Sequence, residues 1–173
     1  MRLPGFIDSH LHVLGIGYYQ SIIDLSELTS VEKIIEKVKD FKHLSMIIGR
    51  GWNQDQFEES RSLTKEDLNQ ISKEIPIILT RVCGHVLVAN DCMIKMAGIH
   101  QNSKQVSGGH FDFQRGIFSE KAMELIYRNI PRPSKDTIKS YFLKANDLLV
   151  SNGITSVASD DFCVFDVDYK EII

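Results

Sequence analysis

Residues 4–12 read Pro-Gly-Phe-Ile-Asp-Ser-His-Leu-His, and this stretch decides the expected fold and site. An apolar start that runs into His-x-His is typical of a short strand, whose side chains alternate between two faces. Asp8, His10 and His12 therefore share one face. Neutral imidazole nitrogens are common ligands for zinc and similar metals, so His10 and His12 are candidate metal ligands. Asp8 is a candidate acceptor that orients one of these ligands.

His-x-His alone also fits two exposed histidines that bind nothing, but the surrounding pattern is more specific. It continues along the chain with Gly-Arg-Gly-Trp-Asn-Gln at 49–54, Arg-Val-Cys-Gly-His at 81–85, Ala-Gly-Ile at 97–99, Gly-Gly at 108–109, Gly-Ile-Phe-Ser-Glu-Lys-Ala at 116–122 and Gly-Ile-Thr-Ser-Val at 153–157. This series resembles the amidohydrolase superfamily of metal-dependent hydrolases, and within it the amidohydrolase family 3 branch.

The resemblance implies an α/β fold, specifically a (β/α)8 TIM-type barrel. A complete barrel of this type takes about 250 residues, and the chain has 173. We therefore expect residues 1–173 to form the N-terminal part of a barrel, about its first five strand and helix units. The flanking β-domain of the family and the C-terminal half of the barrel are expected to be absent.

The alternation of apolar runs and amphipathic segments supports a parallel α/β architecture. Glycines in residues 14–19 favour a loop after the first strand, and residues 101–114 are expected to form a long polar loop. The remaining pattern predicts strands at 44–49, 77–82, 116–120 and 154–159, and helices that begin at Thr29, Thr64, Asn90, Ala122 and Ser134.

Three residues near predicted strand ends are candidate substrate contacts, because barrel chemistry concentrates at the carboxyl ends of the strands. Trp52 could form an apolar wall of a pocket, or it could be a core or lid tryptophan. The resemblance places Arg81 and His85 near the substrate, as positioning groups or stabilisers of a developing oxyanion. The alternatives are a buried ion pair for Arg81 and a structural hydrogen bond for His85.

Glu120 is expected at the carboxyl edge of the strand at 116–120. Many amidohydrolases place a carboxylated lysine at the equivalent step, whereas sequences that resemble this one have a glutamate there, which implies that Glu120 is the third metal ligand. A carboxylate can bridge two cations directly. The alternative is a helix-start glutamate favoured by the helix dipole. Asp160 and Asp161 could edge a site or be solvated loop acids.

Composition sets the class of protein. Hydrophobic residues make up 43% of the chain and charged residues 25%, which argues against disorder. The net charge of −3 gives no electrostatic case for nucleic acid or for an anionic membrane, and no apolar run is long enough for a membrane span. Three cysteines without CxxC spacing suggest buried structural thiols in the cytoplasm.

The implied reaction is hydrolysis of an amide or other carbon–nitrogen bond of a small molecule by metal-activated water. One or two divalent ions, zinc by preference, would act with His10, His12 and Glu120. The alternatives are a deaminase or ester hydrolase of the same superfamily, or a non-catalytic fragment that associates with itself. No residue matches the family's general base, so the chain alone is expected to be inactive, and its open barrel edge favours self-association.

Overall fold

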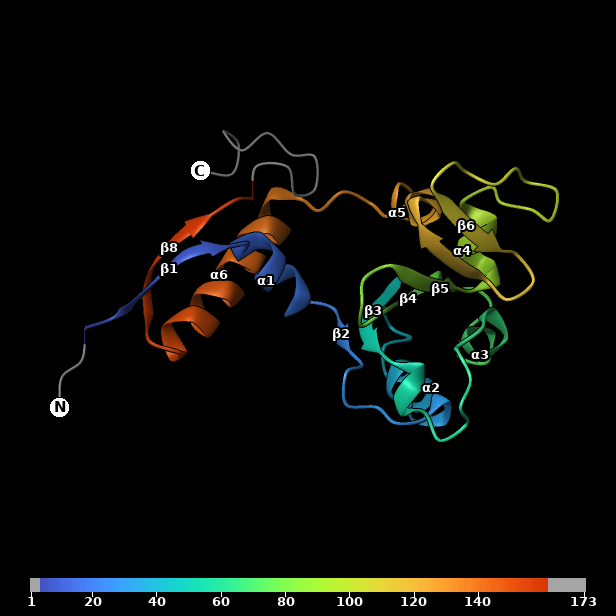
Figure 1. The fold of residues 1–173 in the computed structure, drawn as a ribbon, viewed down its shortest axis with the longest axis horizontal. Coiled ribbons are helices and arrows are strands. Elements are labelled where there is room, and N and C mark those ends of the chain that lie inside the picture. Colours follow the sequence, from blue (N-terminus) through green and yellow to red (C-terminus); the bar gives the residue numbers. More distant parts are fainter. Residues whose placement is uncertain (1–3, 162–173) are drawn as a thin grey trace. The chain divides into compact units, whose positions relative to one another are not determined.

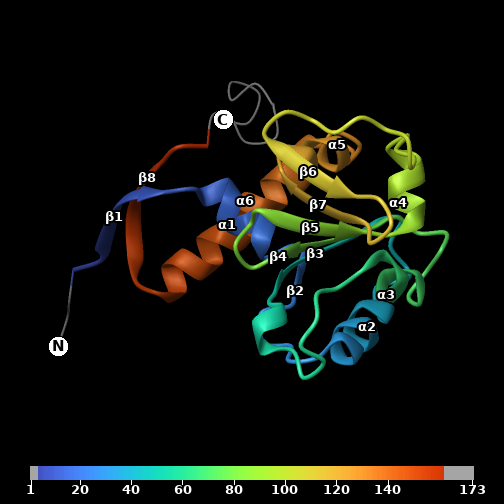
Figure 2. The ribbon, with the colours of Figure 1, turned by 45° about the vertical axis from the view of Figure 1, so that its right-hand side comes forward.

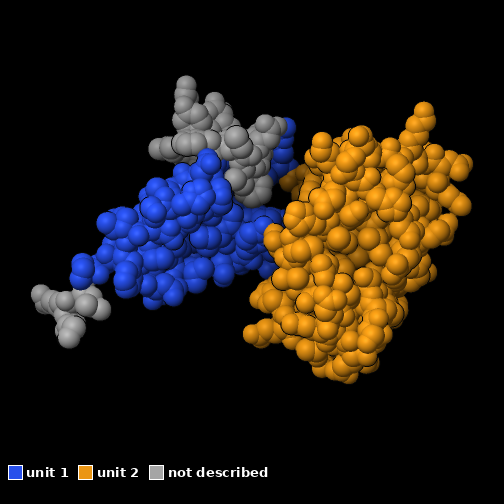
Figure 3. All heavy atoms as spheres, viewed as in Figure 1, with its two compact units in different colours: residues 1–22, 132–173 blue, residues 23–131 orange. Residues whose placement is uncertain are grey.

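The computed structural model describes residues 4–161 and contains two compact units (Figure 3). The first unit comprises the described residues of 1–22 and 132–173, and the second comprises residues 23–131. The second unit is therefore inserted in sequence between two halves of the first.

The first unit is built on two parallel strands that come from opposite ends of the described chain (Figure 1). Its elements are β1 (Phe6–Leu11), α1 (Val13–Tyr19), α6 (Lys135–Ser151) and β8 (Ile154–Ser159). Strand β1 pairs with β8, and α1 packs against α6. Two adjacent parallel strands joined through helices form a β-α-β connection, here interrupted by the second unit.

Residues 14–19 form helix α1, so the expected loop is wrong at this point. The prediction took these glycines as a sign of a loop, whereas one of them, Gly17, lies where two helices pack closely. A Cβ added to Gly17 would lie 1.9 Å from the main-chain oxygen of Tyr141 in α6. Only glycine therefore permits this close approach of α1 to α6.

The second unit is a six-stranded mixed sheet with short helices (Figure 2). The sheet order is β2-β3-β4-β5-β7-β6, in which β2, β3 and β4 run parallel and the other neighbours are antiparallel. The strands are β2 (Ile23–Asp24), β3 (Ile47–Trp52), β4 (Ile77–Arg81), β5 (Val86–Ala89), β6 (Gly109–Asp112) and β7 (Ile117–Glu120). The helices are α2 (Val31–Lys39), α3 (Lys65–Asn69), α4 (Asp91–Met96) and α5 (Glu124–Tyr127), with 3-10 turns η1 (Gln54–Gln56) and η2 (Lys121–Met123).

This sheet is covered on both faces, with α2 and α3 on one side and α4 and α5 on the other (Figure 2). Alternation along β4 divides its side chains between two cores. Ile77 and Leu79 belong to the core that contains α2 and α3, whereas Ile78 belongs to the core that contains α4 and α5. Burial on both faces explains why the strand reads as an uninterrupted apolar run.

The expected strands at 44–49, 77–82, 116–120 and 154–159 correspond to β3, β4, β7 and β8 within a few residues. Their arrangement differs from five successive parallel strands, because β1 pairs with β8 and the others form a separate mixed sheet. The antiparallel part of the mixed sheet begins at residues 82–85, which are a tight turn between β4 and β5. A connection this short permits only antiparallel pairing.

Helix beginnings follow the predicted capping residues closely. The side chains of Asn90 and Ser134 each accept a main-chain N–H of the first turn, and Thr64 forms a capping box with Asp67. Helix α2 begins one residue later than predicted, because the side chain of Ser30 rather than Thr29 accepts the N–H of Lys33.

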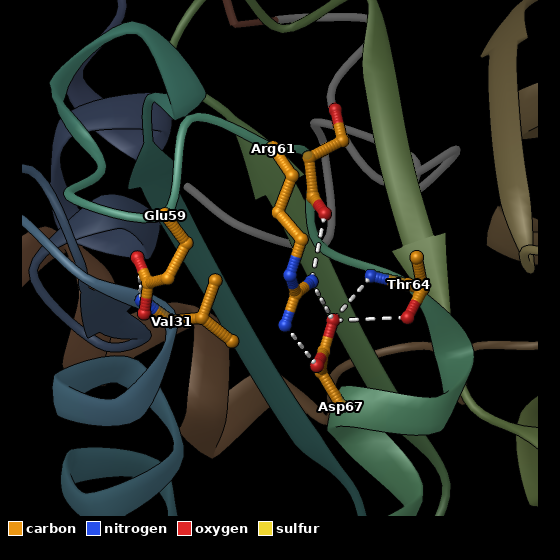
Figure 4. Close-up of polar contacts among 6 residues, drawn as sticks. Val31, Glu59, Arg61, Thr64 and Asp67 are labelled. Carbon is orange, nitrogen blue, oxygen red and sulfur yellow. Dashed lines mark hydrogen bonds and ion pairs between the residues drawn. The ribbon is translucent and has the colours of Figure 1, made fainter.

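The segment between η1 and α3 is tied to α2 and to α3 by carboxylates (Figure 4). Glu59 accepts the N–H of Val31 at the beginning of α2. Arg61 donates two bonds to Asp67, at 2.7 and 2.8 Å, and Thr64 donates its N–H and hydroxyl to the same carboxylate. Burial raises the pKa of Asp67, but the hydrogen bonds from Arg61 and Thr64 outweigh it and hold this pKa below its usual value.

We expect Arg61→Ala to destabilise the chain by about 1.5–3 kcal/mol, because it removes charge-assisted bonds to a buried carboxylate. Since the folded-state pKa of Asp67 is lowered, this stabilisation is present above the unfolded pKa and is lost as the pH falls through the folded value, below about pH 4. Urea unfolding at pH 7 and pH 3 measures both effects. Lys33→Ala, which breaks the exposed pair with Glu58, is the control and should cost at most about 1 kcal/mol. An Arg61→Ala cost no larger than the control would contradict the assignment.

Candidate functional site

The two histidines of the first motif lie side by side at the end of β1. Their ring centroids are 5.5 Å apart, with the rings at 78° to each other. Nδ1 of His12 contacts the main-chain oxygen of Asp160, which follows β8. A carbonyl oxygen can only accept, so in the neutral imidazole of His12 Nδ1 carries the proton and Nε2 keeps its lone pair. Asp8 accepts the main-chain N–H of His10 at 3.0 Å and so fixes the backbone at that residue.

The residues after β8 hold the beginning of α1. The hydroxyl of Ser159 accepts the N–H of Val13 at 3.0 Å and lies in a short contact with the Asp161 carboxylate. Asp161 accepts the N–H of Leu14 at 3.2 Å, and its other oxygen is buried with no hydrogen-bond partner among residues 4–161. Asp161 is therefore an anchor of α1 rather than a solvated loop acid, and through this turn it fixes the position of His12.

The chemistry of this donor pair fits a transition metal, since two neutral imidazoles on one rigid strand are typical ligands. The set is incomplete. In the part of the chain that the structure describes, no group of three or more His, Cys, Asp or Glu side chains could hold a metal ion. Glu120, the third expected ligand, belongs to the second unit, whereas His10 and His12 belong to the first. Its assignment as a ligand stays a prediction.

Glu120 and His85 lie together within the second unit. Oε2 of Glu120 is 3.2 Å from Nδ1 of His85, and the two side chains are 59% and 67% exposed. The main-chain N–H of Glu120 also donates to the oxygen of His85, at 3.0 Å. The sequence predicts a role for each residue separately but not their contact, which depends on the antiparallel pairing of β5 with β7.

Arg81 forms an ion pair and organises the segment after β3. Its Nε donates to Gln54 at 2.6 Å, and its Nη2 donates to Asn53 at 3.3 Å and to Asp55 at 3.0 Å. The side chain of Arg81 is 23% exposed and that of Asp55 is 68% exposed, so this is an ion pair, as in the alternative for Arg81, but it is not a buried one. A substrate contact of Arg81 stays a prediction.

Trp52 lies in the core of the second unit. Its side chain stacks on Phe57 with ring centroids 6.2 Å apart, and its Nε1 donates to the oxygen of Leu79 at 2.9 Å. The residue is 1% exposed, so it presents no surface to a ligand in this chain. The core alternative describes its position, and a substrate contact of Trp52 stays a prediction.

Cys83 is exposed, unlike the buried thiol expected from the sequence, because it lies in the tight turn after β4 rather than inside the strand. Cys92 is half-buried, and Cys163 lies outside the described residues. Desolvation raises the pKa of the Cys83 thiol, but the N–H of His85 and the guanidinium of Arg81 together outweigh it and lower this pKa. The sequence offers no signal for this environment.

We expect Cys83 to react with iodoacetamide faster than Cys92 at pH 7.5, since the thiolate is the nucleophile. Arg81→Ala should raise the pKa of Cys83 and slow its alkylation severalfold, while Asp55→Ala, which removes the ion pair but keeps the guanidinium, should change it less. Peptide mass spectrometry resolves the two rates. Equal rates for both cysteines, or an Arg81→Ala rate equal to that of the unsubstituted chain, would contradict the prediction.

Comparison with known proteins decides the family. The sequence profile described as amidohydrolase family matches residues 1–172. This chain belongs to the amidohydrolase family. It is 33% identical over 174 residues to YtcJ of Bacillus subtilis (strain 168), a protein named as an amidohydrolase, and the match covers 95% of this chain and 33% of that protein.

Two further relatives extend this result. A solved structure of a metal-dependent hydrolase from Pyrococcus horikoshii OT3 superposes with a TM-score of 0.70 and 32% identity, over 90% of this chain and 30% of that one. The N-substituted formamide deformylase of Arthrobacter pascens is 22% identical over 116 residues, which is 64% of this chain and 21% of that protein. The chain thus spans about a third or less of the length of these relatives. Among the described residues, no helix combines the length and apolarity needed to cross a membrane.

Proposed function

We propose that this chain contributes part of the metal site of a hydrolase that cleaves amide or related carbon–nitrogen bonds of small molecules. The observation that carries the proposal is the pair His10 and His12 at the end of β1, with the Asp160 carbonyl directing Nδ1 of His12. Family membership and the metal-dependent hydrolase relative support a hydrolase that uses a divalent metal. The names of the YtcJ and formamide deformylase relatives support the choice of bond.

We also propose that β1 and β8 are neighbouring strands of a (β/α)8 barrel, with residues 23–131 as an insertion after the first strand and helix. Their parallel pairing and the intervening helices support this arrangement. Phe6 and Ile7 are 64% and 77% exposed, although parallel strands are normally buried on both faces. Such exposure fits strands that the remaining elements of a complete barrel cover.

In this proposed mechanism the protein's own groups bind the metal ion and orient its ligands. A bound zinc ion would lower the pKa of water and polarise the scissile carbonyl. His10 and His12 would hold it, with His12 presenting Nε2 because its Nδ1–H donates to the main-chain oxygen of Asp160. Asp8 and Asp161 keep the two ligands in place through main-chain N–H groups. Zinc as the metal, Glu120 as a ligand, self-association and a cytoplasmic location are further parts of the proposal.

We expect the purified chain to retain zinc, and His10→Ala/His12→Ala to lose it, because the donor pair is removed. Metal content by elemental mass spectrometry and a competition titration measure this. The loss of affinity should exceed the roughly 10–100-fold that removal of an outer partner causes. His100→Ala/His110→Ala is the matched control, since both are exposed histidines outside the motif. A chain without zinc, or a double variant that keeps it, would refute the proposed site.

Glu120→Ala in the same titration tests the third ligand, and an unchanged zinc affinity would remove Glu120 from the ligand set.

Amine release from N-substituted formamides tests the bond type. We expect little or no turnover by these 173 residues alone, because no general base has been identified in them. Turnover of formamides would overturn the expected inactivity, and turnover of esters without amides would overturn the proposed bond.

A further inference from the structure

Glu120 has a backbone conformation that residues other than glycine rarely adopt, with φ 52° and ψ −131°. In the described part of the chain, one other non-glycine residue has a positive φ, Ser60 at 50°. Such conformations cost free energy and persist only where surrounding contacts impose them, and they cluster at functional sites. The strain at Glu120 therefore requires a reason.

Helix capping does not supply that reason. Glu120 precedes η2, but its side chain makes no capping hydrogen bond there. Core packing does not supply it either, because the side chain is 59% exposed. Apart from its pairing with Gly109 of β6, Glu120 contacts His85 twice, through the main-chain N–H to the oxygen of His85 and through Oε2 to Nδ1. The strained turn thus directs the carboxylate at this imidazole.

His85 is itself held from the other side, in the turn between β4 and β5. Gly84 takes φ +77° and donates its N–H to the oxygen of Arg81 at 2.9 Å. The N–H of His85 donates to Sγ of Cys83 at 3.5 Å. The backbone on both sides of the pair is therefore fixed, so the contact between the two side chains follows from the fold rather than from chance encounter on the surface.

We propose that Glu120 is a positioning residue for His85. An ionised carboxylate only accepts, so in the neutral imidazole of His85 Nδ1 carries the proton and Nε2 is a directed lone pair. This Nε2 accepts a hydrogen bond from the N–H of an amide-type ligand. The substrate class in this inference rests on the proposed function, whereas the pairing and the tautomer rest on the described geometry alone. One carboxylate oxygen serves His85, so the pairing is also separable from a metal role of Glu120.

The tautomer test uses nitrogen-15 NMR of the histidine-labelled chain, without added metal, at a pH where the imidazoles are neutral. We expect the Nδ1–H form of His85 in the unsubstituted chain and a shift towards Nε2–H in Glu120→Ala. His43, whose Nδ1 lies 3.1 Å from the oxygen of Asp40, is the internal control and should not change. His85 in the Nε2–H form before substitution, or unaffected by it, would overturn the proposal.

The strain test compares melting temperatures. We expect Glu120→Gly to melt at a higher temperature than Glu120→Ala, because glycine accepts the positive φ without cost, and both variants should lose the Nδ1–H form of His85. Ser60→Gly should likewise melt above Ser60→Ala while leaving His85 unchanged. If Glu120→Gly melts at a higher temperature than Glu120→Ala and still loses the Nδ1–H form of His85, unfolding cannot explain that loss. Glu120→Ala melting at or above Glu120→Gly would show that no strain is held at this position.

The ligand test titrates the unsubstituted chain with N-methylformamide and follows the Nε2 resonance of His85. We expect a saturable shift that is at least fivefold smaller in Glu120→Ala. Absence of a shift would overturn the ligand assignment. The zinc titration of the His10→Ala/His12→Ala variant is independent of this measurement, so failure here is distinguishable from failure of the proposed metal site.

Discussion

Parallel pairing of β1 with β8 is the contact on which the candidate metal site depends. It joins residues 6–11 to residues 154–159 and places the turn after β8 beside the end of β1. The contacts of His12 Nδ1 and of the Val13 and Leu14 N–H groups cross this pair, to the Asp160 oxygen, the Ser159 hydroxyl and the Asp161 carboxylate. Without the pairing, the motif at residues 4–12 would carry two histidines of undefined orientation.

The sequence predicts where most strands and helices lie but not how the strands are connected. An apolar run such as residues 77–81 is buried on both faces in a parallel barrel and equally in a mixed sheet covered by helices. Periodicity alone therefore cannot separate the two arrangements. The deciding feature is the short turn before β5. Strand β5 itself has four residues, which are too few to give a strand signal of their own.

The candidate site shows the same division between composition and geometry. His-x-His is visible in the sequence because its chemistry lies in the side chains. The group that accepts the hydrogen bond from His12 is a main-chain oxygen, which every residue possesses. No residue type in the sequence could therefore indicate it. The conformation of Glu120 is hidden for a related reason, since a positive φ is normally signalled by glycine and here it occurs at a glutamate.

The insertion of residues 23–131 between α1 and α6 has a consequence for how such a chain can vary. The entropic cost of closing a loop grows only logarithmically, by about 0.6 kcal/mol for each doubling of its length. The β1 and β8 pair therefore tolerates an inserted segment of almost any size, provided that the segment satisfies its own hydrogen bonds and buries its own core, as residues 23–131 do. Evolution can lengthen, shorten or exchange that segment as a module while the strands that carry the histidines keep their register.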